Sequence, residues 1–188
     1  MKKIWITGSR GRTGQALMSL LDVVEYEIFD TDKDEVDITD ENQVYSFIKM
    51  NRPDVIINCS GFHEKTGSLK ENVDHSYDVN AVGARNLAQA AEHINAKLIQ
   101  LSTDDIFSEK TETPYNEFDF PKPESFLSIT GRAGNSSASL MESCCRICHN
   151  CSRVAIEKNY LDALFSQGFA GLRTGIIKLS RLPYNNRP

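Results

Sequence analysis

The sequence predicts an α/β fold in which a doubly wound parallel sheet carries helices on both faces. Apolar runs of strand length alternate with helical patterns over residues 1–125, which is typical of parallel sheets joined by right-handed crossovers. The first apolar run ends in a loop with three glycines, and this loop opens a helical pattern. Together these features indicate a Rossmann-type domain, the arrangement that binds dinucleotides.

Four segments have the composition of buried strands. The third of them, DVIIN, is apolar and β-branched, as a strand covered on both faces should be. Each segment is separated from the next by a helical pattern, so we expect all four to lie in one parallel sheet. The predicted strands cover residues 3–7, 25–29, 54–58 and 97–101.

Three helical patterns separate these strands. The first begins in the glycine loop and carries apolar residues at helical spacing. The second covers about residues 40–50, with Asp40 as its N-terminal cap, and Pro53 prevents its continuation. The third covers about residues 71–93, and its early half is polar.

The glycine loop is the strongest chemical signal in the sequence. Gly8, Gly11 and Gly14 follow the first strand directly and have the spacing GxxGxxG. Glycines permit a tight strand-to-helix turn and a close approach of the backbone to a pyrophosphate. The N-terminus of the following helix then directs free N–H groups at that anion. We therefore predict that these three glycines bind a dinucleotide.

The end of the second strand bears on the choice between NAD and NADP. Asp30 lies where the motif places an acid that hydrogen-bonds the ribose hydroxyls, and further acids crowd the same loop. Arg10, Arg12 and Lys33 are basic residues that can meet a 2′-phosphate instead. Because acids and bases occur together, the sequence leaves both cofactors open.

Hydroxyl side chains end the fourth predicted strand. Ser102 and Thr103 follow its apolar residues, and the carboxyl ends of strands line the ligand crevice in open α/β sheets. A hydroxyl there can polarise a substrate carbonyl for hydride attack, whereas in a plain turn it would only cap a helix.

Charge and hydropathy exclude two classes of partner. The chain has 188 residues and a formal net charge of −5, and nucleic acids and anionic membranes bind basic surfaces. No apolar run approaches the ~20 residues that span a bilayer, and the N-terminus lacks the apolar stretch of a secretory signal. We expect a cytoplasmic protein that binds neither nucleic acid nor membrane.

Several segments together resemble one enzyme family. These are WITGSRGRTGQAL, VDITD, RPDVIINCSGF, VNAVGARNLAQAA and LSTDDIFSEKTETPYNEFD. In this order and spacing they resemble the dTDP-4-dehydrorhamnose reductases, which are extended short-chain dehydrogenases/reductases. The resemblance implies reduction of the 4-keto group of a dTDP-sugar by NADP(H) or NAD(H). It also implies a possible homodimer and, in some family members, a magnesium ion.

The resemblance also implies roles for single residues. Asp37 and Ile38 would lie near the adenine, and Asn80 matches an asparagine that the family carries on a helix. Thr103 would assist a catalytic tyrosine. The segment just after the third strand would flank the nicotinamide ribose; its residues are Cys59, Ser60 and Gly61.

The sequence departs from the family at the catalytic pair. The family pattern is roughly YxxxK, in which the tyrosine donates a proton and the lysine lowers its pKa and holds the ribose. Leu127 and Gly131 occupy these two positions, and neither can perform the chemistry. The chain is therefore either a reductase with little or no activity or a non-catalytic NAD(P)-binding regulatory protein, a role that one relative plays for methionine adenosyltransferase.

The composition changes after the motifs end near Gly134. Residues 126–188 hold three of the 26 acidic residues, eight of the 21 basic residues and four of the five cysteines. Cys145, Cys148 and Cys151 have a spacing that can bind a metal, but zinc knuckles use two separated ligand pairs. We therefore predict no metal site.

A frameshift is the hypothesis that best explains this change. Read one nucleotide later, codons permitted for residues 148–153 can encode VIIVR, the strand that the family has next. We predict a nucleotide-binding domain over residues 1–134 and an atypical tail over 135–188. The family's substrate domain would then be largely missing.

Overall fold

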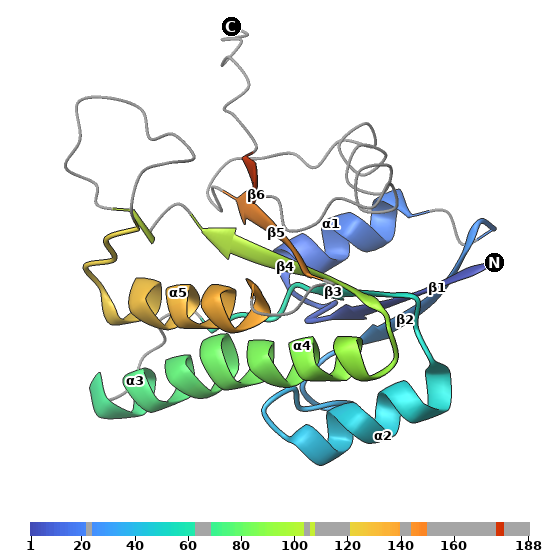
Figure 1. Ribbon diagram of the computed structural model, residues 1–188, viewed down its shortest axis with the longest axis horizontal. Helices are drawn as coiled ribbons and strands as arrows, with labels where there is room; N and C mark the ends of the chain where they lie inside the picture. The colour runs from blue at the N-terminus through green and yellow to red at the C-terminus, as the bar shows by residue number, and fades with distance from the viewer. Residues whose placement is uncertain are drawn as a thin grey trace, which may run out of the picture.

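The computed structural model describes residues 1–21, 24–62, 69–103, 106–107, 121–139, 144–149 and 176–178. Six parallel strands form one sheet in the order β2-β1-β3-β4-β5-β6 (Figure 1). This arrangement confirms the predicted fold class. The strands are β1 (Lys2–Thr7), β2 (Tyr26–Thr31), β3 (Val55–Asn58), β4 (Lys97–Thr103), β5 (Cys144–His149) and β6 (Ile176–Lys178).

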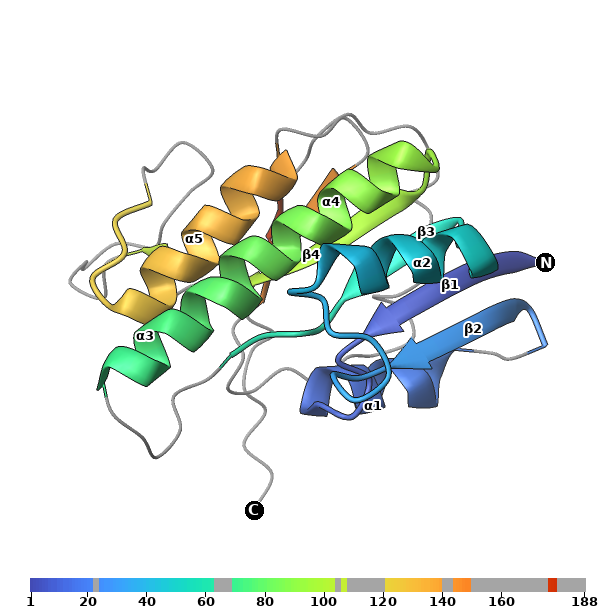
Figure 2. The ribbon, with the colours of Figure 1, turned by 90° about the horizontal axis from the view of Figure 1, so that it is seen from below.

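Helices cover both faces of the sheet. In Figure 1, α1 lies above the sheet and α2 and α4 lie below it, and Figure 2 shows α5 beside α4 on the lower face. None of the helices in the described ranges is both long enough and apolar enough to cross a membrane. The helices are α1 (Arg12–Leu20), α2 (Glu41–Asn51), α3 (Leu69–Tyr77), the π-helix η1 (Asp78–Gly83), α4 (Ala84–His93) and α5 (Phe126–Ser139).

The alternation of side chains along β1 produces two hydrophobic cores. Ile4 and Ile6 point to one face and pack with Leu17 of α1. Trp5 points to the other face, where it packs with residues of α2 and α4 and stacks on Phe47 with 4.4 Å between ring centroids. The two cores bury the last four residues of β1, so its carboxyl end is held rigidly where the glycine loop begins.

Local signals account for the ends of α2. The Asp40 side chain accepts hydrogen bonds from the amides of Asn42 and Gln43, as its predicted capping role requires. Arg52 then adopts a left-handed conformation, with φ 46°, directly before Pro53. The predicted cap and stop of this helix are both confirmed.

The helix predicted over residues 71–93 is three segments with unbroken helical backbone. α3 passes into η1 and η1 into α4, with helical dihedral angles at both junctions. The wider π turn was not predicted, because residue spacing shows where a helix is amphipathic and not where its hydrogen bonds change register.

The predicted tail contributes to the sheet. β5 pairs in parallel with β4, and β6 pairs with β5. α5 runs across residue 134, the predicted domain boundary, because the helix continues to Ser139. The division of the chain into residues 1–134 and 135–188 stays a prediction. Cys151 lies outside the described residues, as do the side chains of the cysteines in β5.

Candidate functional site

The glycine loop joins β1 to α1 at the carboxyl edge of the sheet. Gly8 has φ +66°, and a Cβ atom there would lie 2.7 Å from the amide nitrogen of Ser60. A Cβ atom on Gly14 would collide with the carbonyl oxygen of Gly8 and lie 2.6 Å from the Cα of Ser9. Both positions therefore require glycine, because the loop folds tightly on itself and on the segment after β3.

The N-terminus of α1 has the features of an anion-binding site. Gly11 caps this helix without any side-chain hydrogen bond, and its first turn contains no acidic residue. The amide groups of a first turn have no partner within the helix, and the helix dipole favours negative charge there. A pyrophosphate fits this position.

The loop also lies at the point where the strand order reverses. β1 has β2 on one side and β3 on the other, and their chain connections leave in opposite directions. Ligands of open α/β sheets bind in the crevice outside the carboxyl ends of such strands. The predicted residues Gly8, Gly11 and Gly14 are therefore placed together where the fold expects a ligand.

A row of buried polar side chains crosses the sheet just beneath this crevice. Thr7 donates from Oγ1 to Asn58 Oδ1 at 2.8 Å, and Asn58 Nδ2 donates to Gln100 Oε1 at 2.8 Å. On the other side of β1, Trp5 Nε1 donates to Thr31 Oγ1 at 2.9 Å. Because every one of these buried groups has a partner, the row ties four strands together without an unsatisfied polar atom.

Asn58 also positions the segment that follows β3. Its Oδ1 accepts a second hydrogen bond, from the amide of Ser60 at 3.0 Å. Cys59 donates its amide to the carbonyl oxygen of Thr7 at 3.1 Å. The predicted ribose-flanking segment is thus held against β1 by backbone and side-chain bonds.

The thiol of Cys59 is not a nucleophile in this setting. Burial raises its pKa to about 12, and the thiolate is the reactive form of cysteine. Cys59 therefore stays protonated at neutral pH.

Asn80 connects the same segment to the helices below the sheet. Its Oδ1 accepts from the amide of Phe62 at 2.8 Å, and its Nδ2 donates to Ser76 and Thr130, each at 3.3 Å. The hydroxyls of Ser76 and Thr130 are themselves 2.6 Å apart and buried. Asn80 thus joins η1, α3 and α5 to the segment that includes Gly61, which lies one residue before Phe62.

The two residues that were predicted to lie near the adenine, Asp37 and Ile38, have structural partners of their own. Asp37 Oδ1 accepts from the amide and hydroxyl of Thr39, at 2.9 and 2.7 Å. Ile38 is buried in the core, and its carbonyl oxygen accepts from Asn86 Nδ2 at 3.0 Å. Only the surface around Asp37, and not the side chain of Ile38, remains accessible to a ligand from this segment.

The end of β2 is strongly acidic. Asp30 is exposed near the end of this strand, and Arg10 Nη1 contacts Asp34 Oδ2 at 2.9 Å while its Nη2 contacts Glu35. Lys33 lies 4.0 Å from Asp37. Arg12 is exposed on the first turn of α1. Two of the three candidate 2′-phosphate ligands thus face carboxylates of the loop that follows β2.

The end of β4 meets α5. The buried Ser102 hydroxyl accepts a short hydrogen bond from Nδ2 of the buried Asn135. Thr103 is the last residue of β4, and its side chain lies outside the described part of the structure. Ser102 is therefore held by α5, and only the backbone position of Thr103 is established.

The positions of the missing catalytic pair share one side of α5. Leu127 and Gly131 are one helical turn apart, and both are partly exposed. A Cβ atom on Gly131 would meet nothing within 4 Å. There is thus room for a larger side chain at residue 131, although the sequence supplies none.

Several residues of the site were not predicted from the sequence. Asn58 and Gln100 interrupt apolar strands with a buried amide, a departure from the strand pattern that could have identified them. Ser76 and Asn135 look like ordinary helix residues, and Thr130 matches a hydroxyl position of the family pattern to which no role was assigned. Among the described side chains, no three His, Cys, Asp or Glu residues gather as metal ligands would, so the implied magnesium has no ligand set there.

Comparisons with known proteins converge on one family. The family model described as the RmlD substrate binding domain matches residues 1–148. The match passes Gly134, after which no further resemblance was expected, and it includes the rest of α5 and most of β5. The extent of the resemblance was therefore underestimated from the motifs.

Two of the curated relatives are named as dTDP-4-dehydrorhamnose reductases. A dTDP-4-dehydrorhamnose reductase of Aggregatibacter actinomycetemcomitans is 35% identical over 124 residues, which are 65% of this chain and 42% of that protein. One from Streptomyces griseus is 34% identical over 69% of this chain and 42% of its own length. The chain thus spans less than half the length of these curated relatives.

Solved structures agree in fold. The dTDP-4-dehydrorhamnose reductase of Bacillus anthracis, in complex with NADP, has a TM-score of 0.83 and 27% identity, over 97% of this chain and 75% of that one. The ortholog from Clostridium acetobutylicum has a TM-score of 0.73 and 29% identity, over 88% and 59% of the two chains.

Proposed function

The chain belongs to the RmlD substrate binding domain family, and on that premise we propose that it binds a nicotinamide dinucleotide at the carboxyl edge of its sheet. The observation that carries this proposal is the glycine loop. Its backbone packs against Ser60 at the switch point between β1 and β3, and it leads into a helix N-terminus without a side-chain cap. This geometry suits a pyrophosphate.

We propose the reaction of the family as the reaction of the complete site. The relatives are named as dTDP-4-dehydrorhamnose reductases, so the substrate would be a dTDP-sugar with a 4-keto group. The bound dinucleotide would supply the hydride. The chain's own residues would bind the pyrophosphate with the glycine loop, flank the ribose with Cys59, Ser60 and Gly61, and orient the carbonyl with Thr103.

At the positions of the family's catalytic pair, this chain has no side chain that can donate a proton to the reduced carbonyl. Leu127 carries no ionisable atom, and Gly131 carries no charge that could hold a ribose or lower a neighbour's pKa. General acid catalysis contributes about 10²–10⁴-fold to such reactions. We therefore propose that the chain binds its cofactor but turns over slowly or not at all.

A pair of glycine variants tests the binding site. Gly14→Ala places a Cβ atom against the Gly8 carbonyl, so NADH and NADPH binding should fall at least tenfold in a fluorescence titration. Gly131→Ala is the matched control, because its Cβ atom meets nothing within 4 Å, and it should bind like the parent chain. Far-UV circular dichroism checks that both variants are folded. Equal binding by both variants, or no binding by the parent chain, would contradict the proposal.

A non-catalytic regulatory protein is the second candidate, and the residues at 127 and 131 favour it. Both candidates predict cofactor binding. Oxidation of NADH in the presence of dTDP-4-dehydrorhamnose would support the reductase. Cofactor binding without turnover, together with a stable protein partner in co-purification, would support the regulatory protein.

A further inference from the structure

The side chain of Arg10 forms ion pairs with the acidic loop that follows β2. Its guanidinium contacts Asp34 Oδ2 at 2.9 Å and also contacts Glu35. Its amide donates to Asp32 Oδ2 at 3.1 Å. These carboxylates raise the pKa of Arg10 above its usual value. The side chain is thus anchored at both ends of the residue although more than half of it, 57%, is exposed.

The loop itself is internally ordered. The other carboxylate oxygen of Glu35 accepts from the amide of Asp32 at 2.7 Å, and Ser9 donates its amide to the carbonyl oxygen of Thr31 at 3.1 Å. The glycine loop and the loop after β2 are therefore joined by backbone as well as by the Arg10 ion pairs. Arg10 spans the gap between them.

That gap is where the adenosine ribose of a dinucleotide would lie. The pyrophosphate belongs at the N-terminus of α1 and the ribose-binding acid at the end of β2. A 2′-phosphate adds a charge of about −1.5 to −2 at this point. It would approach a guanidinium that already has two carboxylate partners.

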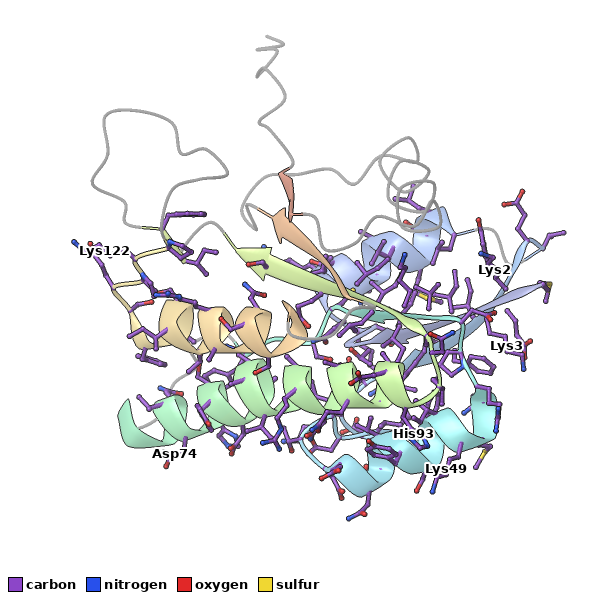
Figure 3. The ribbon with its side chains drawn as sticks, viewed as in Figure 1. Lys2, Lys3, Lys49, Asp74, His93 and Lys122 are labelled. Atoms are coloured by element: carbon purple, nitrogen blue, oxygen red, sulfur yellow. The ribbon has the colours of Figure 1, made fainter. Side chains whose placement is uncertain are left out.

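The net negative charge of the loop after β2 is unfavourable to a phosphate. Residues 30–37 carry five carboxylates, whereas residues 8–12 and 30–37 together carry three cations, of which Lys33 lies 4.0 Å from Asp37. Figure 3 shows the labelled basic residues Lys2, Lys3, Lys49 and His93 at the end of the molecule where β1 begins and α2 and α4 end, and Lys122 at the other end. The carboxylates are Asp30, Asp32, Asp34, Glu35 and Asp37, and the cations are Arg10, Arg12 and Lys33.

We propose that Asp34 and Glu35 determine the cofactor specificity of this site, by holding Arg10 and so favouring the 2′-hydroxyl of NADH over the 2′-phosphate of NADPH. This inference rests on the proposed cofactor binding. It assigns a role to two residues that never touch the reacting atoms. They act on the selectivity between NADH and NADPH through charge. Their carboxylates pair with the Arg10 guanidinium, which the 2′-phosphate would need as a partner, and they also repel the phosphate.

The test compares dissociation constants for NADH and NADPH by calorimetry. The parent chain should bind NADH about tenfold more tightly than NADPH, a factor that corresponds to about 1.4 kcal/mol. The Asp34→Asn/Glu35→Gln variant should bind NADPH about tenfold more tightly than the parent does, with its NADH affinity nearly unchanged. A purely structural role for the two acids would lower both affinities together.

Two controls complete the design. Asp74→Asn/Glu92→Gln removes the same two charges from exposed positions on α3 and α4, and it should keep the parent's preference; Figure 3 marks Asp74. Raising the salt concentration from about 0.05 M to about 0.5 M should shrink the preference, because surface charges are screened.

The outcomes are distinct. If the parent binds NADPH as tightly as NADH, or if the acid-to-amide variant leaves the ratio unchanged, the specificity proposal is overturned while cofactor binding stands. If the parent binds neither nucleotide, the proposed function fails and this inference falls with it.

Discussion

Cys59 lies in the segment that would flank the nicotinamide ribose, and its chemistry is set by burial. The residue is partly buried, and removal of its thiol from water disfavours the charged thiolate. Its pKa rises from the usual 9.0 to about 12. The residue is therefore a neutral, space-filling part of the site at physiological pH.

This shift predicts a pH dependence for both reactivity and stability. At pH 8, alkylation of Cys59 by iodoacetamide should be at least about a hundredfold slower in the folded chain than in urea, since only the thiolate reacts. Because the folded pKa is the higher one, the stability that Cys59 contributes is present below pH 9 and is lost as pH rises toward 12. Mass spectrometry of the peptide that contains Cys59 measures the rate. A folded-state rate that levels off above about pH 9 to 10, as the rate in urea should, would show that the thiol is not shielded.

Arg10 and Gly131 show two further ways in which single residues define this site. Arg10 is a cation with its charge already engaged, and Gly131 is a missing side chain with room around it. In our proposals, the first favours NADH over NADPH, and the second leaves the position of the family's lysine without a charge. Both conclusions depend on the neighbours of the residue and not on its type alone.

At the scale of elements, the contact between α5 and η1 holds the lower face together. A Cβ atom on Gly134 would collide with the carbonyl oxygen of Asn80 and lie 3.1 Å from its carbonyl carbon. The neighbouring hydroxyls of Ser76 and Thr130 close the same contact with a buried hydrogen bond. The two helical segments therefore approach as closely as their backbones allow.

Gly134→Ala should separate these elements. Overpacking against backbone typically costs about 1–3 kcal/mol, so the free energy of unfolding should fall by about that amount. Urea titration followed by the fluorescence of Trp5, the single tryptophan of the chain, measures the change.

Gly131→Ala in the same helix is the matched control. Its Cβ atom enters open space, and alanine favours the helix by up to about 1 kcal/mol over glycine, so this variant should be as stable as the parent or slightly more stable. Equal losses in the two variants would indicate a general effect on α5 and not the close contact with Asn80.

At the scale of the whole molecule, the question is whether the last third of the chain has the reading frame of its family. The family match ends at residue 148, within β5, and the composition has already changed by then. Acids become scarce and cysteines frequent after residue 126. The frameshift hypothesis explains these changes together.

Independent sequencing of the coding DNA across codons 120–188 tests this hypothesis. A slip of one or two nucleotides that restores the VIIVR strand and a longer frame is the expected result. It would make the cysteine cluster an accident of translation. A confirmed frame would reject the hypothesis, and Leu127, Gly131 and the cysteines would then be true features of the protein.

The sequence by itself determined the order along the chain of the first four strands and of the three helical segments between them. It also determined the cap of α2 and the glycine loop. These features depend on local sterics and on the spacing of apolar residues, which neighbours along the chain express directly. Strand ends shifted by one or two residues, since polar Thr31, Ser102 and Thr103 continue the ladders beyond the apolar runs.

Only the tertiary structure decided what the polar residues of the site do. Arg10 meets acids more than twenty positions away, Asn80 joins Phe62 to Thr130, and β5 pairs with β4 residues that lie 46 positions earlier in the chain. The same sequence pattern would permit a phosphate-binding Arg10 or a cofactor-binding Asn80. Which partner each side chain acquires depends on how distant segments pack, and no spacing within one segment contains that information.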